Sequence, residues 1–161
     1  ESSDDWRRAQ RSKGETSQST LDGRLKTQQA GMKRSVMSLN GRGGKKYREQ
    51  RAINSARLMS AAQAEYLSTL VVSFHNGVQR YQAGFDGEFE PLDQLELARE
   101  MEMLLVNLEL EKTIFRSDHA SNYLVLKGTL NQDKERLLKM VRLALEQPGA
   151  VPLRQEWQRR L

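Results

Sequence analysis

The sequence predicts an α/β fold, and within that class a partial (half) TIM-type barrel with parallel strands alternating with helices. Short runs rich in β-branched and apolar residues alternate with longer segments whose apolar residues recur at helical spacing. Such alternation is typical of parallel strands joined by right-handed crossovers. A complete eight-stranded barrel needs about 250 residues, whereas this chain has 161. Only three strands are evident, and so small a parallel sheet leaves open edges, so we expect part of a larger barrel or sheet.

The first half of the chain predicts two weak helices, a strand and a stronger helix. The first 31 residues carry thin apolar stripes interrupted by glycines, which indicates two short helices. The helical spacing of apolar residues then ends, and KRSVMSL at 33–39 predicts a short strand. After the turn Gly41-Arg42-Gly43-Gly44 a helix is expected over 45–61. Its buried stripe consists of four residues at helical spacing, Ala52, Ile53, Ala56 and Met59.

The next segment predicts two strands separated by the strongest helix. YLSTLVVSF at 66–74 is the best strand candidate of the chain. The glycines and the proline of 78–91 indicate a long loop, or a short helix plus a loop. Asp93, with Glu96 three residues later, resembles a capping box and opens the helix. One face of that helix is lined by Leu97, Met101, Leu104, Leu105 and Leu108. KTIFR at 112–116 predicts a short strand.

A last helix and a polar tail complete the expected order. The helix begins near Asn131 and stops at Pro148-Gly149. It buries an apolar face made of Leu137, Leu138, Val141, Ala144 and Leu145. The tail is mostly polar, and Trp157 is its expected anchor. The domain division is therefore a barrel portion at 1–147 and a C-terminal tail at 148–161.

The composition excludes several classes of site. The chain has no cysteine, so it offers no disulfide, no thiolate for zinc or an iron–sulfur cluster, and no cysteine nucleophile. With two histidines, an all-imidazole metal site is improbable. No run approaches the roughly 18 apolar residues of a membrane span. The first residues form no apolar signal segment, so we expect a cytoplasmic protein with no membrane partner.

The net charge of +5 is distributed unevenly along the chain. Residues 1–60 carry 14 Lys and Arg against 6 Asp and Glu, whereas residues 61–161 carry 12 against 15. The basic excess peaks between Lys33 and Arg51, and such a cluster can attract RNA or another acidic partner. The alternative is an ordinary solvated helix face. That alternative is favoured because base-stacking aromatic residues are scarce near the cluster.

Three polar segments directly follow predicted strands, where functional residues of α/β folds gather. Asn40–Gly44 enters a helix, and its glycines would let main-chain amides approach a ligand, although a plain tight turn is at least as good an explanation. His75 could be a general base or a hydrogen-bonded loop residue. The segment 116–123 is unusually dense in polar groups. Ser117 and Asp118 can serve as turn residues, but the additional His119 and Asn122 favour a site.

The polar segment at 116–123 also carries a family resemblance. RSDHASNYL at 116–124 and KGTLNQDKERLL at 127–138 resemble the C-terminal region of a branch of radical S-adenosylmethionine (radical SAM) enzymes. Weaker similarity to the same enzymes extends over most of the chain, in the segments 1–5, 13–16, 32–44, 87–92 and 153–161. The resemblance implies the second half of the barrel only, because the cluster-binding C-x3-C-x2-C loop of the family is absent.

The resemblance implies a chain that supplies barrel wall and ligand contacts but cannot react alone. In the full-length parent, S-adenosylmethionine and a [4Fe–4S] cluster would be the cofactors, and this chain would hold no metal. Glu1 and Ser2 would lie near the ribose of S-adenosylmethionine, and the turn of Gly41, Gly43 and Gly44 beside its adenine and methionyl parts. His119 and Asn122 would face the pocket. The implied partners are the missing N-terminal barrel half and a small-molecule, peptide or RNA substrate of unknown identity.

Independently of the resemblance, the strand assignments predict where the polar segments lie. Segments 41–44, 75–77 and 117–122 should converge on one rim of the sheet, because each follows a parallel strand. His119 should be partly exposed there, with Asn122 or Asp118 orienting its ring. The alternative is that His119 caps its own turn.

Overall fold

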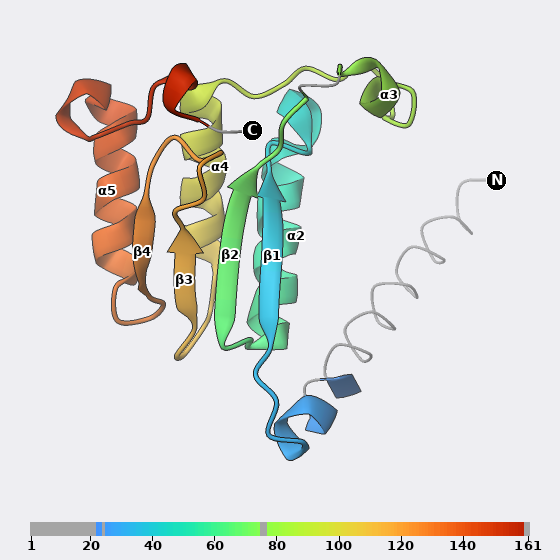
Figure 1. Ribbon diagram of the computed structural model, residues 1–161, viewed down its shortest axis with the longest axis vertical. Coiled ribbons are helices and arrows are strands. Elements are labelled where there is room, and N and C mark those ends of the chain that lie inside the picture. Colours follow the sequence, from blue (N-terminus) through green and yellow to red (C-terminus); the bar gives the residue numbers. More distant parts are fainter. Residues whose placement is uncertain (1–21, 24, 75–76, 160–161) are drawn as a thin grey trace.

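A four-stranded mixed sheet forms the centre of the molecule in the computed structural model, which describes residues 22–23, 25–74 and 77–159 (Figure 1). The strands are β1 (Ser35–Asn40), β2 (Tyr66–Val71), β3 (Ile114–Ser117) and β4 (Leu126–Thr129). The helices are α2 (Gly44–Ala62), α3 (Gln79–Gln82), α4 (Gln94–Asn107) and α5 (Lys134–Glu146), followed by 3-10 turns at Pro148–Ala150 and Glu156–Gln158. The strands lie in chain order, β1-β2-β3-β4.

The three predicted strands are parallel neighbours, as the alternation of elements predicts. β1 pairs with β2 and β2 with β3, with Ser68 opposite Met37 on one side and Arg116 on the other. The α/β class and these three strands are confirmed. The expectation of parallel strands throughout is wrong at β4, which pairs antiparallel with β3. The connection 118–125 is too short for a parallel crossover, which takes a dozen or more residues.

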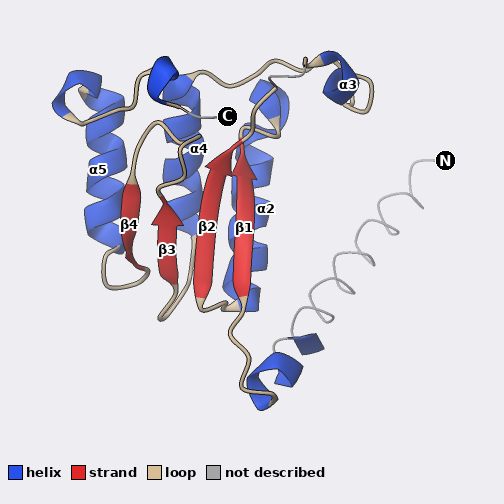
Figure 2. Ribbon diagram, in the orientation of Figure 1, coloured by secondary structure: helices blue, strands red, loops and turns tan. Residues whose placement is uncertain are grey.

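Among the described residues, the long helices cover one face of the sheet and none covers the other face (Figure 2). Alternate residues of β1 show this division, because Val36, Ser38 and Asn40 are more buried than their neighbours. On the opposite face Met37 is 65% exposed and Leu39 is 41% exposed. The sheet is open and does not close on itself. In a sheet of this kind, apolar residues on an uncovered face lack the burial that normally stabilises them.

The core lies between the sheet and α2, α4 and α5. Its largest fully buried side chains come from every layer: Leu67, Leu104, Leu105, Phe115, Leu126, Leu137 and Val141. Of the predicted helix stripes, Ile53 and Leu145 are only half-buried, while the other members are buried. The stripe positions were therefore mostly predicted correctly from helical spacing alone.

A local signal explains the start of α4. The capping box of α4 is confirmed, because Glu96 N donates to Asp93 Oδ1 at 2.8 Å and Asp93 N donates to Glu96 Oε2 at 2.9 Å. The last helix begins at Lys134, later than predicted, because Asn131 has a φ of 80°, which is not helical. Trp157 is 82% exposed, so the prediction that it anchors the tail is wrong. None of the described helices is long and apolar enough to cross a membrane.

Candidate functional site at the carboxyl ends of the strands

The ends of β1 and β2 and the loop after β3 meet at one rim of the sheet. Val72 N donates to Asn40 O at 2.9 Å, which joins the ends of the first two strands. Val71 N donates to Ser121 Oγ at 3.1 Å, so the loop after β3 reaches the end of β2. The predicted convergence is confirmed for the segments that follow β1 and β3, at 41–44 and 117–122, because both adjoin the end of β2. His75 and Asn76 lie outside the described residues.

Asn122 lies at the centre of this rim and is 3% exposed. Its Nδ2 donates to Thr69 O at 2.8 Å and to Ser117 Oγ at 3.1 Å. These two bonds fix the amide, because a main-chain carbonyl can only accept. The Oδ1 atom of Asn122 and the hydroxyl of Thr69 have no hydrogen-bond partner within the described residues. A buried polar atom without a partner is costly, so this position favours a donor from a ligand or a water.

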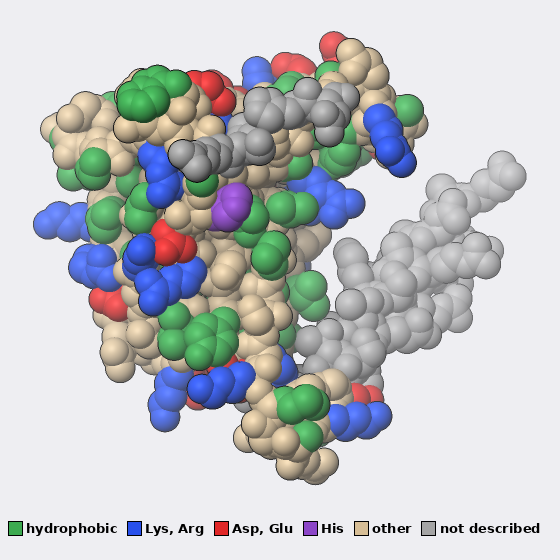
Figure 3. All heavy atoms as spheres, in the orientation of Figure 1, with side chains coloured by type: hydrophobic (Ala, Val, Ile, Leu, Met, Phe, Trp, Pro, Cys, Tyr) green, Lys and Arg blue, Asp and Glu red, His purple; other side chains and the backbone are tan. Residues whose placement is uncertain are grey.

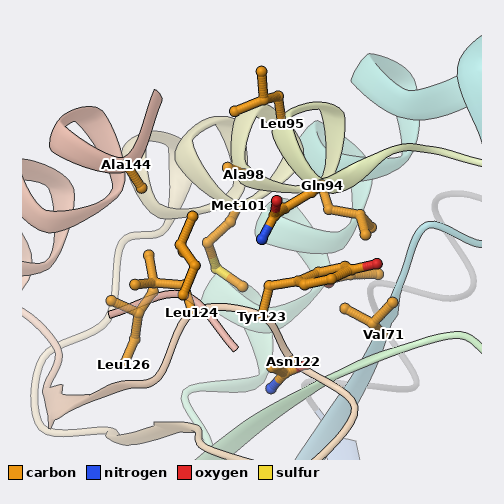
Figure 4. Close-up of a pocket in the computed structure, with 13 residues that line it drawn as sticks. Val71, Gln94, Leu95, Ala98, Met101, Asn122, Tyr123, Leu124, Leu126 and Ala144 are labelled. Atoms are coloured by element: carbon orange, nitrogen blue, oxygen red, sulfur yellow. The ribbon is translucent and has the colours of Figure 1, made fainter. Parts of the chain in front are cut away.

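A small cavity of about 40 Å³ opens beside Asn122 (Figure 4). Gln94, Ala98 and Met101 of α4 line one wall, and Tyr123 and Leu124 of the loop after β3 line another. Asn40, at the end of β1, is also among the lining residues and is almost fully buried. The cavity is mainly apolar with a few amide groups, but its volume is far below the roughly 300–1,000 Å³ of a small-molecule pocket. A second hollow of about 240 Å³ lies between Gly41, Val72, Phe74 and Arg159.

His119 is exposed, and its hydrogen-bond partner differs from the expected one. Its Nδ1 lies 2.9 Å from Ser121 Oγ, and Ser121 N donates to the same nitrogen at 3.2 Å. Asn122 N donates to His119 O at 3.0 Å. Neither of the expected partners orients the ring, since Asp118 pairs with Lys127 at 2.9 Å and Asn122 bonds to Thr69 and Ser117. The ring is thus held by its own turn, which is itself bonded to β2 through Ser121.

Two arginines of the tail hold the loop that carries His119 and Asn122. Arg154 Nη1 donates to His119 O at 2.6 Å and to Asn122 O at 3.0 Å, and its Nη2 donates to Asp118 O at 3.2 Å. Arg159 Nε donates to Ser121 O at 2.8 Å. These bonds satisfy main-chain carbonyls that a turn leaves without partners. Sequence analysis missed both arginines, because nothing local marks a side chain that bonds 35 residues away.

Tyr123 connects the same tail to the rim. Its hydroxyl donates to Glu156 Oε2 at 2.7 Å, and the Arg159 guanidinium lies 3.9 Å from the centre of its ring. Burial and the bond to Glu156 raise the pKa of Tyr123 to about 12. Tyr123 therefore stays protonated at neutral pH and serves as a hydrogen-bond donor there.

The glycines of the turn after β1 are required by close packing. Gly41 and Gly44 have φ of +81° and +56°, which disfavours any side chain. A Cβ on Gly44 would lie 2.7 Å from Glu90 O, and one on Gly43 would lie 2.6 Å from Arg51 Cδ. Protein atoms thus fill the space beside Gly43 and Gly44, whereas Gly41 also borders the larger hollow. Glu1 and Ser2 lie outside the described residues.

Glu100 of α4 is a buried carboxylate that the sequence analysis did not single out. It is 4% exposed and accepts a hydrogen bond from Gly41 N at 2.6 Å. Burial raises its pKa, while the Gly41 amide and the charges of Arg51 and Arg48 act in the opposite direction. A signal was present, because position 100 falls inside the apolar stripe of this helix, between Leu97 and Leu104.

The comparisons give no relative: no family model matches the chain, and neither a curated protein nor a solved structure is similar to it. The residues themselves must therefore indicate which groups fit the rim. Among the described residues, no group of three or more metal-binding side chains occurs. Asn122 Oδ1 is buried without a partner and belongs to a residue that lines the cavity, so it can accept a hydrogen bond from a ligand or a water.

Proposed function

We propose that this chain is the C-terminal half of a radical SAM α/β barrel, which supplies pocket wall and ligand contacts to a missing N-terminal half. The observation that carries the proposal is the one-sided layering of the sheet. Three parallel strands have the long helices of the described residues on one face, as in the wall of an α/β barrel. The other face exposes Met37 and Leu39. The family assignment is supported by the sequence similarity at 116–138.

An incomplete sheet explains two otherwise unfavourable features. Within the described residues, β1 is an edge strand with a partner on one side only, and an open edge strand invites pairing with another strand. Next to this edge lies the exposed apolar surface of Met37 and Leu39. Figure 3 shows hydrophobic and basic side chains together on this face of the molecule. A missing barrel half would pair with the edge and cover the surface at once.

Under this proposal, the rim residues contact the ligands of the complete protein. Asn122 Oδ1 would accept a hydrogen bond from S-adenosylmethionine or the substrate, because it is buried, fixed and unpartnered. His119 would meet the substrate from the exposed end of the same loop. The turn of Gly41, Gly43 and Gly44 would place the end of β1 beside the cofactor, with Gly41 nearest because it borders the larger hollow. Glu1 and Ser2 keep their proposed place near the ribose.

The cofactors would be bound jointly with the missing half. When bound, S-adenosylmethionine and a [4Fe–4S] cluster supply radical hydrogen abstraction. This chain has no cysteine, so the cluster ligands must come from the other half. The proposed contribution of this chain is to bind and orient, through Asn122 and the glycine turn. The substrate is a small molecule, a peptide or RNA.

The first test is the coding sequence that adjoins this chain on its upstream side. A C-x3-C-x2-C motif followed by strand and helix patterns in the adjoining reading frame would support the proposal. The two segments should then copurify when expressed together. Anaerobic reconstitution should load a cluster on the pair and not on this chain alone. A stoichiometric cluster on this chain alone would contradict the ligand argument.

The second test concerns His119 in the reconstituted pair. His119→Ala should lower single-turnover release of deoxyadenosine, while the melting temperature changes little, because the ring is exposed. Lys139→Ala, an exposed change on α5 far along the chain, serves as the control. Unchanged release together with a large loss of melting temperature would make His119 a structural residue of its turn.

A further inference from the structure

A separate open groove of about 500 Å³ lies on the outer side of α2 and extends to the segment 81–85. Its lining combines two arginines, three aromatic residues, amides and a serine: Arg42, Gly43, Tyr47, Gln50, Arg51, Asn54, Ser55, Leu58, Tyr81 and Phe85. Figure 1 shows α3, at the start of this segment, on the β1–α2 side of the molecule. The groove shares none of its lining with the cavity beside Asn122.

The fold neutralises much of the basic cluster and leaves the groove arginines available. Four of the seven cations at its peak form ion pairs: Arg34 with Glu65, Lys45 with Glu90, Lys46 with Asp86, and Arg48 with Glu96. Within the described part of the chain, the side chains of Arg42 and Arg51 make no hydrogen bond or ion pair. The groove lining contains no acidic residue. Of the three remaining cations, Arg42 and Arg51 line the groove and Lys33 does not. The charge of Arg51 also acts on the buried carboxylate of Glu100. The groove therefore carries two guanidinium groups that form no ion pair among the described residues.

The fold also brings aromatic rings to these arginines from a distant segment. Tyr81 and Phe85 follow Arg51 by about thirty positions in the sequence, yet both line the groove with Tyr47. The rings support one another, with centroids 5.5 Å apart for Tyr47 and Phe85 and 6.0 Å apart for Tyr81 and Phe85. The Tyr81 hydroxyl donates to Arg42 O, which ties the aromatic wall to the turn. The scarcity of aromatics near the basic cluster is thus a property of the sequence and not of the folded surface.

Guanidinium groups, aromatic faces and side-chain amides are together suited to bind nucleotides. Guanidinium groups bind phosphate, aromatic rings stack on bases, and Gln or Asn amides can bond to base edges. A groove of this volume is large enough for a ligand of nucleotide size. We propose that this groove binds a nucleotide, with Arg42 and Arg51 on its phosphate and the base against Tyr81 or Phe85. The inference is independent of the barrel proposal, because it uses the outer surface of the helix layer.

The test is binding of the full chain to a fluorescein-labelled single-stranded oligoadenylate of about 12 nucleotides, measured by anisotropy over a salt series. Arg42→Gln and Arg51→Gln should each weaken binding. Each should also reduce the slope of log K against log salt by about 0.7, which is the contribution of one phosphate contact on a single strand. Tyr81→Leu should weaken binding about 10-fold with the slope unchanged, because it removes stacking and leaves the charges.

Arg99→Gln is the matched control, since it removes the same charge from an exposed site on α4 outside the groove. Circular dichroism melts of all variants separate loss of binding from loss of fold. Titration with free AMP distinguishes the source of the nucleotide: comparable per-site affinity indicates a free nucleotide, and binding of the oligomer alone indicates RNA. The proposal is overturned if neither probe binds, or if Arg99→Gln weakens binding as much as Arg51→Gln. Equal competition by inorganic phosphate and by AMP would also overturn it.

Discussion

The main-chain amide of Gly41 donates a 2.6 Å hydrogen bond to the buried carboxylate of Glu100, across 59 positions of sequence. This bond joins the end of β1 to the middle of α4. The carboxylate is almost fully buried, and its pKa is raised by burial. The bond positions the glycine turn of the candidate site, and the burial of the carboxylate makes the stability of this contact depend on pH.

Glu100→Gln should remove part of this pH dependence. A raised pKa in the folded state stabilises the fold fully below the unfolded-state value, and this contribution is lost as pH rises through the folded-state pKa. Gln keeps an acceptor for Gly41 N and carries no charge. We expect the variant to become more stable relative to the natural chain as pH rises from 5 to 8, because the amide has no charge to bury. Urea unfolding at several pH values measures the difference in free energy of unfolding between the variant and the natural chain.

Glu111→Gln, at an exposed position, is the control for this series and should leave the pH profile unchanged. A large loss of stability for Glu100→Gln at pH 7 would contradict the prediction. It would mean that Arg48 and Arg51 hold the carboxylate in its charged form.

The pairing of Arg34 and Glu65 predicts a pH dependence of stability opposite to that of Glu100, because its contribution is lost as pH falls. Arg34 N donates to Glu65 Oε2 at 2.7 Å and Arg34 Nη2 donates to Oε1 at 3.1 Å, and these bonds lower the pKa of Glu65 to about 2. The stability that they contribute is present above the unfolded-state pKa of about 4.5 and is lost as pH falls toward 2. Glu65→Gln should cost about 1 kcal/mol at pH 7, the upper end for an exposed pair. Its cost should shrink below pH 4. A cost that stays constant down to pH 2 would exclude this pairing as the cause.

The tail arginine Arg154 should matter more than the large tail aromatic residue. Arg154→Gln removes donors from the carbonyls of Asp118, His119 and Asn122. We expect a loss of about 2 kcal/mol, the cost of leaving such groups unsatisfied. Faster hydrogen exchange at the Asn122 amide should accompany it. Trp157→Ala should change stability by less than about 0.5 kcal/mol, because the side chain is 82% exposed. Equal effects of the two changes would refute this account of the tail.

The glycine turn should not tolerate a methyl group at its last position. Gly44→Ala places a Cβ 2.7 Å from Glu90 O at a φ of +56°. Left-handed strain and the clash together should cost roughly 3 kcal/mol. Gly149→Ala is the matched control, because no atom lies within 4 Å of the added carbon. Thermal melts of the two variants provide the measurement. Similar melting temperatures would show that the turn can relax.

Much of the fold could be predicted from the sequence, because its signals act over a few residues. The spacing of Ala52, Ala56 and Met59 defines a buried helix face without reference to any partner. Asp93 and Glu96 cap α4 through bonds between neighbours. The strands β1, β2 and β3 follow from their composition, and their parallel order follows from the helices between them. The polar segment that carries Asn122 was located by the same reasoning.

Tertiary contacts decided what local signals do not specify. β4 includes Gly128 and Lys127 and is a weak strand by composition, so only its pairing with β3 defines it. The exposure of Trp157 and the clamp by Arg154 depend on where the tail crosses the rim. Glu100 acquires its role from Gly41, and Arg51 acquires aromatic neighbours from 81–85. In each case the partner is distant in sequence, and the energy of a contact depends on which residues the folded chain brings within a few ångströms.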